Sequence, residues 1–263
     1  MQDLFSLDGK VIVITGGIGY LGSAITGALL DYGAKVVAAD IAEQGPEAIA
    51  ANGNSAAGLY YMKCDVSRTG SIRELFRKTR ELCGKINVLI NCATYGAGYG
   101  PAGTVENMTD EDWTKGLDGA AGTAFRCTRE IIPYFDENPG GSIINFGSMY
   151  GLVSPDPGIY GSSGQNNPVN YGAGKAAVLQ LTRYCAAHLA KREIRVNSIT
   201  PGPFPDPKRL PPEEFLNNLK DKTMLKKVGE AKDITGAILL LASEASAFMT
   251  GSNIVVDGGW TAW

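Results

Sequence analysis

The sequence predicts an α/β protein in which a doubly wound, parallel sheet of seven strands forms the middle of three layers. Short apolar runs alternate along the whole chain with longer runs of helical periodicity. Parallel neighbours need helical crossovers, and a sheet covered on both faces has continuous apolar strands. The predicted strands are residues 10–15, 35–40, 59–64, 86–90, 142–147, 194–199 and 253–256. No linker, charge block, low-complexity tract or repeat divides them, which predicts one domain over residues 1–263.

The first predicted strand runs directly into a glycine-rich turn. The seven residues after Thr15 include four glycines, and a helix is predicted from about Tyr20 to Tyr32. Glycines let the backbone turn tightly and approach a pyrophosphate, while the helix N-terminus offers free N–H groups and a positive dipole end. The predicted dinucleotide contacts here are Gly16, Gly17, Ile18, Gly19, Tyr20 and Leu21. The alternative is a glycine-rich connection that binds no ligand.

The second predicted strand ends in a carboxylate, Asp40, followed by Ile41. A carboxylate at this point of a dinucleotide-binding unit accepts hydrogen bonds from the adenosine ribose. The same charge would repel a 2′-phosphate by about 4 kcal/mol at a separation of about 4 Å and an effective dielectric constant of about 20. Its neighbours Ile41 and Ala42 are not basic. The sequence therefore favours NAD over NADP.

A tyrosine and a lysine lie four positions apart, Tyr171 and Lys175, in a stretch with a helical pattern. Side chains at i and i+4 share a helix face. A cation near a phenol favours the phenolate and lowers the phenol's pKa. Tyr171 is therefore a candidate acid/base group near neutral pH. The alternative is an ordinary exposed helix pair.

Taken together, these motifs resemble the short-chain dehydrogenase/reductases with a single Rossmann-type domain that binds NAD(P). The resemblance covers nearly the whole chain. It implies that Ser148, after the predicted strand at 142–147, joins Tyr171 and Lys175 as the third catalytic residue. It also implies further cofactor contacts at Asp65, Val66, Asn91, Ala93, Pro201 and Gly202, and at Tyr171 and Lys175, with Lys175 holding the ribose hydroxyls. The segments at 148–151 and 256–263 resemble gluconate 5-dehydrogenases and sugar oxidoreductases of this family.

Four positions depart from the family pattern. The middle glycine of the cofactor turn has moved to Gly19, with Tyr20 at its usual position, and Thr94 replaces a glycine after the fourth strand. Asp206 stands where many members have a threonine that holds the nicotinamide carboxamide. Ala120 takes the place of an asparagine that takes part in the family's proton relay. These departures predict altered cofactor geometry and a relay supplied by other groups.

The interval between Ser148 and Tyr171, 23 positions, is longer than the common family pattern. Residues 149–170 are rich in glycine, proline, amides and hydroxyls, which is typical of a loop. Because the loop lies between two catalytic positions, we expect it to form a wall of the substrate pocket; the alternative is a solvated surface loop. Predicted substrate contacts in it are Tyr150, Tyr160, Asn166 and Asn167. Such donors suit a polyhydroxylated substrate.

A proline-rich segment begins the predicted lid, residues 201–222. Residues 201–212 hold six of the chain's thirteen prolines, before a helix predicted near Glu213 to Asp221. Prolines limit the freedom of the unfolded chain. In this lid Phe204 is predicted to cover the nicotinamide, and Lys208 or Arg209 to meet a substrate carboxylate. The alternative for the two cations is simple solvation.

Composition excludes several classes of function. The net charge is −3, and the sequence has no cluster of lysines and arginines of the kind that binds the phosphate backbone of a nucleic acid. The N-terminal residues lack a signal sequence and no apolar run of about 18 residues occurs, which predicts a cytoplasmic protein without a membrane partner. Five scattered cysteines and a single histidine, His188, predict no metal site.

The predicted function is NAD-dependent interconversion of a secondary alcohol and a ketone on a sugar, sugar acid or polyol, with Tyr171 as acid/base. Two alternatives stay open: a reductase of surface-sugar or flagellin modification, and a non-catalytic NAD-binding protein. The family resemblance implies a homotetramer or homodimer. Trp260 and Trp263 at the chain's end are candidate interface residues.

Overall fold

The computed structural model describes residues 3–43, 58–98 and 100–263. Its described part contains a sheet of seven parallel strands in the order β3-β2-β1-β4-β5-β6-β7, which confirms the predicted fold class. The strands are β1 Val11–Thr15, β2 Lys35–Asp40, β3 Leu59–Lys63, β4 Val88–Asn91, β5 Ser142–Phe146, β6 Arg195–Pro201 and β7 Asn253–Val256.

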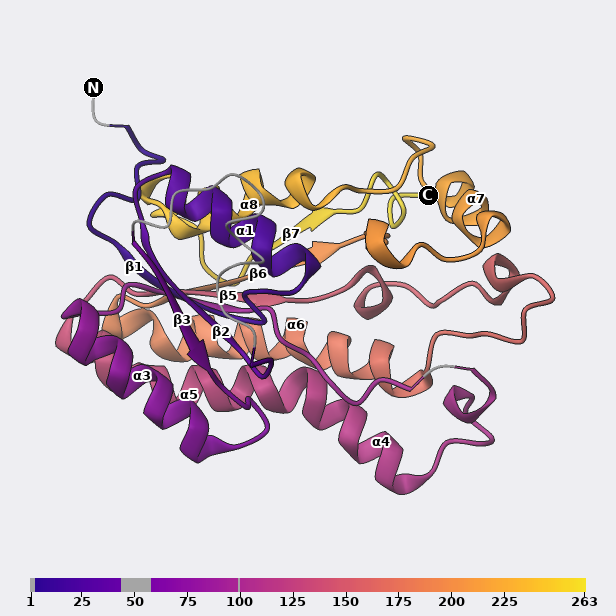
Figure 1. The fold of residues 1–263 in the computed structure, drawn as a ribbon, viewed down its shortest axis with the longest axis horizontal. Helices are drawn as coiled ribbons and strands as arrows, with labels where there is room; N and C mark the ends of the chain where they lie inside the picture. The colour runs from indigo at the N-terminus through magenta and orange to yellow at the C-terminus, as the bar shows by residue number, and fades with distance from the viewer. Residues whose placement is uncertain (1–2, 44–57, 99) are drawn as a thin grey trace.

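Helices cover both faces of this sheet. In Figure 1, α1 and α8 lie on one face, and α3, α5 and α6 lie on the other. The helices are α1 Tyr20–Asp31, α3 Thr69–Cys83, α4 Asp110–Leu117, α5 Thr123–Glu137, α6 Val169–Leu189, α7 Glu213–Lys222 and α8 Thr235–Ala242. A π-helical segment, η2 Asp118–Gly122, joins α4 to α5.

The alternating faces of the strands build two cores. Ile12 and Ile14 of β1 pack in the core that includes Ile25 of α1. Val13, which points the other way, packs in the core that includes Phe76 of α3 and Phe135 of α5. Since both faces are covered, all five residues of β1 are buried. This explains why the sequence has unbroken apolar strands rather than an alternating pattern.

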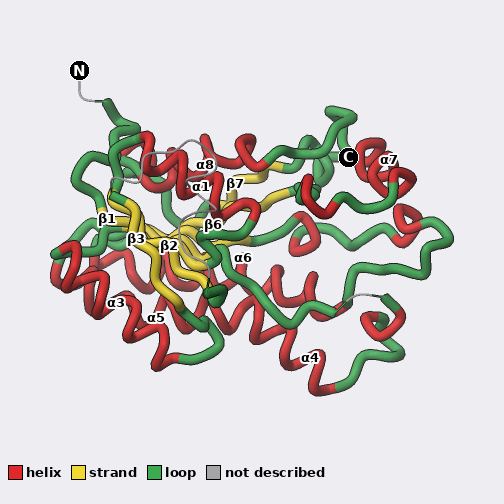
Figure 2. Tube along the Cα trace, viewed as in Figure 1, coloured by secondary structure: helices red, strands yellow, loops and turns green. Residues whose placement is uncertain are grey.

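The topology fixes where a ligand can bind. β1 lies between β2 and β4, so the strand order changes direction there, and open α/β sheets bind ligands outside the carboxyl ends of the strands at such a point. The long loops after β4, β5 and β6 extend toward the end of the molecule where α4 and α7 lie (Figure 2). These loops supply the walls of the site.

The segment at 149–170, predicted as a loop, contains short helices. The loop at 149–170 holds the 3₁₀ helices η3 Met149–Gly151 and η4 Pro157–Tyr160, and α6 already begins at Val169. Asp156 begins η4 because its carboxylate accepts a hydrogen bond from the N–H of Gly158 at 2.8 Å. Among the described residues, no helix has both the length and the apolar character needed to cross a membrane.

Candidate active site

The glycine turn after β1 has a shape that only small residues permit. Gly16 has φ +71°, and a Cβ on Gly22 would lie 1.9 Å from the Gly16 carbonyl oxygen. A Cβ on Gly17 would lie 2.8 Å from Cβ of Ala38, so Gly17 serves the packing of the turn on β2. Gly19 has more open space, its nearest neighbour being 3.4 Å away. The turn thus offers backbone to a ligand at Gly19, next to the N-terminus of α1.

A groove of about 620 Å³ opens beside this turn. Nine of the predicted cofactor residues line it: Gly16, Gly19, Tyr20, Leu21, Asp40, Ile41, Asp65, Val66 and Ala93. Gly17 and Ile18 are not among its lining residues. The glycine turn, the helix N-terminus and the carboxylate at the end of β2 together fit a dinucleotide.

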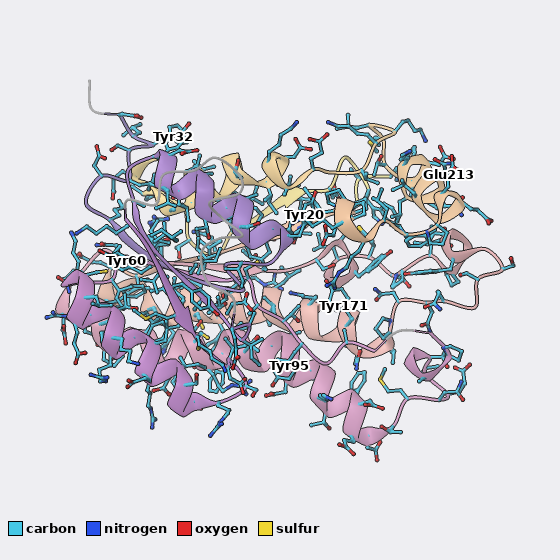
Figure 3. All side chains as sticks on the ribbon, viewed as in Figure 1. Tyr20, Tyr32, Tyr60, Tyr95, Tyr171 and Glu213 are labelled. Atoms are coloured by element: carbon cyan, nitrogen blue, oxygen red, sulfur yellow. The ribbon has the colours of Figure 1, made fainter. Side chains whose placement is uncertain are left out.

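Several residues that line this groove carry no motif in the sequence, among them Tyr95 and Lys115. Lys115 comes from α4, which the chain places far from the glycine turn. Figure 3 shows Tyr20 at the start of α1, Tyr95 after β4 and Tyr171 at the start of α6, all near the middle of the molecule. Only packing of separate elements brings such residues together, and no spacing in the sequence indicates it.

Tyr95 is held by a charged network. Its hydroxyl hydrogen-bonds Asp118, whose carboxylate accepts two hydrogen bonds from Arg126, at 2.6 and 3.0 Å. The Nε of Arg126 donates to the carbonyl of Val66 at 3.1 Å. The hydrogen bonds from Arg126 lower the pKa of Asp118. This network joins two walls of the groove, Tyr95 and Val66, through a single guanidinium.

The three predicted catalytic residues converge. Ser148 follows β5, and Tyr171 and Lys175 lie on the first turns of α6. Ser148 hydrogen-bonds Tyr171. Lys175 Nζ lies 5.9 Å from the ring centroid of Tyr171 and donates to the carbonyl oxygen of Phe146 at 2.7 Å. Lys175 is only 5% exposed, so its ammonium is held in place rather than solvated.

Burial dominates the acid/base properties of this trio. It raises the pKa of Tyr171, against a smaller lowering by the hydrogen bond from Ser148. It lowers the pKa of Lys175 to about 8. The predicted fall in the Tyr171 pKa is therefore wrong for this structure, because removing the phenol from water disfavours the phenolate. The i, i+4 spacing indicated which groups approach one another and not how dry their surroundings are.

Thr94 and Ala120, two of the departures from the family pattern, lie next to one another through Gly119. The hydroxyl of Thr94 donates to the Gly119 carbonyl oxygen at 3.1 Å, within the π-helical segment η2. Ala120 is buried, and a Cβ on Gly174 of α6 would lie 2.8 Å from its Cβ. The small residues Ala120 and Gly174 thus let η2 approach α6 closely.

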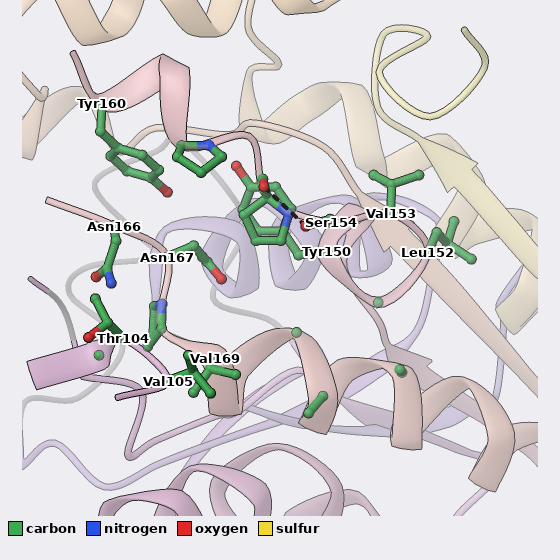
Figure 4. A pocket seen from close by; sticks show the side chains of 18 of the residues that line it. Thr104, Val105, Tyr150, Leu152, Val153, Ser154, Tyr160, Asn166, Asn167 and Val169 are labelled. Carbon is green, nitrogen blue, oxygen red and sulfur yellow. Dashed lines mark hydrogen bonds between the residues drawn. The ribbon is translucent and has the colours of Figure 1, made fainter. Parts of the chain in front are cut away.

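A second cavity, of about 720 Å³, lies beside the loop at 149–170 and the first turns of α6, and Ser148, Tyr171 and Lys175 are not among its lining residues (Figure 4). All four loop residues predicted to contact substrate line it: Tyr150, Tyr160, Asn166 and Asn167. The side-chain oxygens of Asn166 and Asn167 are buried and have no hydrogen-bond partner. Residues 103–106, which the sequence analysis did not single out, form part of the wall. Lys208 and Arg209 are exposed and do not line this cavity.

Four further predicted cofactor residues are not among the residues that line the groove. Asn91 is buried, and its Nδ2 donates to Oδ1 of Asn145 at 2.8 Å, which ties β4 to β5. A Cβ on Gly202 would lie 2.5 Å from Cα of Asp257, so Gly202 serves close packing beside β7. Phe204 packs against Gly229 and the core under α8, because an apolar ring gains more from burial there. Pro201, the last residue of β6, does not line the groove either.

The aromatic residues at the chain's end divide in their surroundings. Trp260 is buried in its own chain, with its ring edge-to-face with Tyr150 at a centroid distance of 6.2 Å. Trp263 is 69% exposed, and Lys226 Nζ lies 5.1 Å from its ring centroid. Trp260 therefore supports the substrate loop, and only Trp263 offers a ring to a partner.

Comparison with known proteins gives matches over the whole site. A family model described as enoyl-(acyl carrier protein) reductase matches residues 16–261. The 3-oxoacyl-[acyl-carrier-protein] reductase of Thermotoga maritima is 32% identical, over 96% of this chain and 98% of its own. The D-arabinitol 2-dehydrogenase (ribulose-forming) of Candida albicans is also 32% identical, over 98% and 95%. A structure of a short-chain dehydrogenase from Leptospira borgpetersenii with bound NAD⁺ has a TM-score of 0.86 at 28% identity, covering 99% of this chain and 96% of that one. The likeness is thus not confined to the glycine turn.

Proposed function

Because the chain belongs to the short-chain dehydrogenase/reductase family, we propose that it is an NAD-dependent oxidoreductase that interconverts a secondary alcohol and a ketone on a polyhydroxylated substrate. The substrate class comprises sugars, sugar acids and polyols. The observation that carries the proposal is the convergence of Ser148, Tyr171 and Lys175 at the carboxyl ends of the strands. A protein that only binds a dinucleotide has no chemical need for these three groups together.

Each catalytic side chain has a role that its contacts support. NAD supplies the acceptor for the hydride when it is bound. In the direction of oxidation, Tyr171 Oη takes the proton of the substrate hydroxyl, and Ser148 holds the substrate oxygen beside it. Lys175, anchored on the Phe146 carbonyl, holds its ammonium 5.9 Å from the Tyr171 ring centroid, where its positive charge acts against the burial that disfavours the phenolate needed for proton transfer. In the direction of reduction, Tyr171 returns the proton.

The preference for NAD rests on Asp40 and its neighbour. Asp40 lines the groove, and Ile41 beside it is 64% exposed and apolar. A 2′-phosphate near Asp40 would meet a repulsion of about 4 kcal/mol under the conditions used above, with no basic group on Ile41 to offset it. The NAD⁺ bound in the Leptospira relative supports the same choice.

The proposed substrate class rests on the loop at 149–170. Asn166 and Asn167 line the cavity, and their side-chain oxygens are buried without a hydrogen-bond partner among the described residues. Buried acceptors without partners are costly unless a ligand or water meets them. Hydroxyl groups of a polyol are suitable donors. The D-arabinitol 2-dehydrogenase relative supports this class, whereas the acyl-carrier-protein reductase shows that the family also takes other substrates.

A direct test is turnover of polyols, free sugars, sugar acids and cyclitols with NAD and with NADP, beside a steroid and an acyl thioester. We expect a polyhydroxylated alcohol with NAD to give the highest kcat/KM. The Tyr171→Phe variant is the matched control, because it keeps the ring and removes the titrating hydroxyl. A steroid or acyl thioester as the best substrate would refute the proposed class. Absence of turnover with every alcohol would favour the non-catalytic alternative.

A further inference from the structure

We infer that the contact between the substrate loop and α7 forms a negatively charged part of the substrate site that takes uncharged polyols and rejects sugar acids. We name this contact the loop–lid seam and define it as residues 156–168 together with α7. The inference rests on the proposed function and narrows its substrate class. It is carried by the contacts of this seam and by the charges that line the two cavities beside it.

Three contacts fix the loop on α7. Lys222 forms an ion pair with Asp156. The side-chain amide of Asn218 donates to the Ile159 carbonyl oxygen at 3.0 Å. The rings of Tyr160 and Phe215 stack with centroids 5.1 Å apart and an interplanar angle of 27°. The loop is thus a wall attached to the lid rather than a solvated surface loop.

The seam adjoins the catalytic residues. Tyr160, Phe215 and Tyr171 pack in one apolar cluster, which also contains Tyr150. Tyr150 and Tyr160 hydrogen-bond one another, so the phenols form a continuous aromatic wall from the seam to Tyr171. A substrate whose reacting carbon lies at Tyr171 can extend its remaining carbons along this wall.

Two cavities meet at the seam. The cavity of about 720 Å³ and a smaller one of about 260 Å³ share Tyr160 and Asn166 in their linings. The smaller cavity is also lined by Gln165, Glu214 and Asn218. Asn166 Oδ1 and Asn167 Oδ1 are buried and have no hydrogen-bond partner among the described residues.

The charges that line the two cavities have one sign. Glu106 lines the larger cavity and Glu214 the smaller, and neither cavity has a lysine or arginine among its described lining residues. A Cβ on Gly161 would lie 2.8 Å from Glu214 Oε1, so this carboxylate points across the seam at the loop. No described residue forms an ion pair with Glu106 or Glu214 within 4.0 Å. Their negative charge therefore opposes an anionic substrate.

The experiment compares kcat/KM for a polyol and for its aldonic acid, for example D-arabinitol and D-arabinonate, in the holoenzyme with saturating NAD. The variants are Glu214→Gln and Glu106→Gln. The matched control is Glu213→Gln, whose carboxylate precedes Glu214 on α7, is exposed and lines neither cavity (labelled in Figure 3). All four proteins are first compared by thermal unfolding to establish equal folding.

We expect the wild type to prefer the polyol. Each of the two test variants should raise the acid-to-polyol ratio of kcat/KM about two- to fivefold at low ionic strength, as for partly exposed charges. The rise in the acid-to-polyol ratio should shrink in about 0.5 M salt, because salt screens electrostatic interactions. A rise caused by a purely structural change would not depend on salt in this way. Glu213→Gln should leave the ratio unchanged.

The outcomes separate this inference from the proposed function. Turnover of polyols with a ratio that neither test variant changes, or a wild type that prefers the aldonic acid, would overturn the seam's role and leave the oxidoreductase in place. Failure of every polyhydroxylated alcohol to react in the wild type would overturn the proposed function, and this inference with it.

Discussion

Lys175→Met should change the pH dependence of stability as well as activity. Lys175 is 5% exposed, and burial lowers its pKa to about 8. Folding therefore removes an ammonium group from water at neutral pH, with one hydrogen bond to the Phe146 carbonyl in return. Methionine keeps most of the side-chain length and is readily buried, but carries no charge.

The size of the effect follows from the pKa change. The pKa of Lys175 falls from 10.5 in the unfolded chain to about 8 in the folded protein, which corresponds to about 3 kcal/mol. The folded pKa is the lower one, so the unfolded chain binds more protons between about pH 8 and pH 10.5. The free energy of unfolding of the wild type should therefore rise with pH across that window relative to Lys175→Met. From pH 7 to pH 9 the rise should be about 1 kcal/mol.

The measurement is urea unfolding of both proteins without nucleotide at pH 7 and pH 9. The absolute gap also contains the cost of leaving the Phe146 carbonyl unpaired, about 1–3 kcal/mol, which does not depend on pH. The change in the gap is thus the informative quantity. Lys191→Met, at an exposed lysine just after α6, is the control and should show no such change. A Lys175→Met gap that is equal at the two pH values would refute the argument from burial.

Three further predictions address chemistry, cofactor and assembly. Tyr171→Phe should lower kcat about 10²- to 10⁴-fold while NAD affinity, measured by calorimetry, persists; near-full activity would contradict the acid/base role. NAD should bind at least about tenfold more tightly than NADP, a difference of about 1.4 kcal/mol, and Asp40→Ala with Ile41→Arg should narrow it. Equal dissociation constants in the wild type would count against the role of Asp40. Light scattering at micromolar concentration should show a homotetramer or homodimer, and removal of residues 261–263 should weaken it; a monomeric wild type would disprove this.

The strands could be predicted because a strand that is buried on both faces of the sheet appears in the sequence as an unbroken apolar run. β2 begins and ends where the apolar run 35–40 predicted. β4 begins two residues later than predicted, at Val88, because Asn87 before it is engaged through its side chain. Asn87 Oδ1 accepts from the N–H of Val11 at 2.9 Å, a contact across 76 positions that no apolar pattern indicates.

The catalytic trio could be predicted because family motifs and helical spacing both indicate it. The wall of the cofactor groove formed by Lys115 and Tyr95 could not be predicted, because these residues reach it through the packing of α4 and of the loop after β4. Asn91 and Phe204 are predicted cofactor contacts by resemblance, and in the structure their side chains contact Asn145 and Gly229. A motif identifies the strand end or turn where a residue lies, but it does not determine the direction in which the side chain points.

The departures from the family pattern at Thr94 and Ala120 are explained by the packing around η2. A side chain larger than alanine at position 120 would meet α6 at Gly174, since even a Cβ on that glycine would approach within 2.8 Å. α6 carries Tyr171 and Lys175, so the spacing between η2 and α6 bears directly on where the acid/base pair lies. Thr94 holds η2 from the opposite side through the Gly119 carbonyl. Ala120, Gly174 and Thr94 therefore together hold η2 close to α6, the helix that carries the catalytic residues.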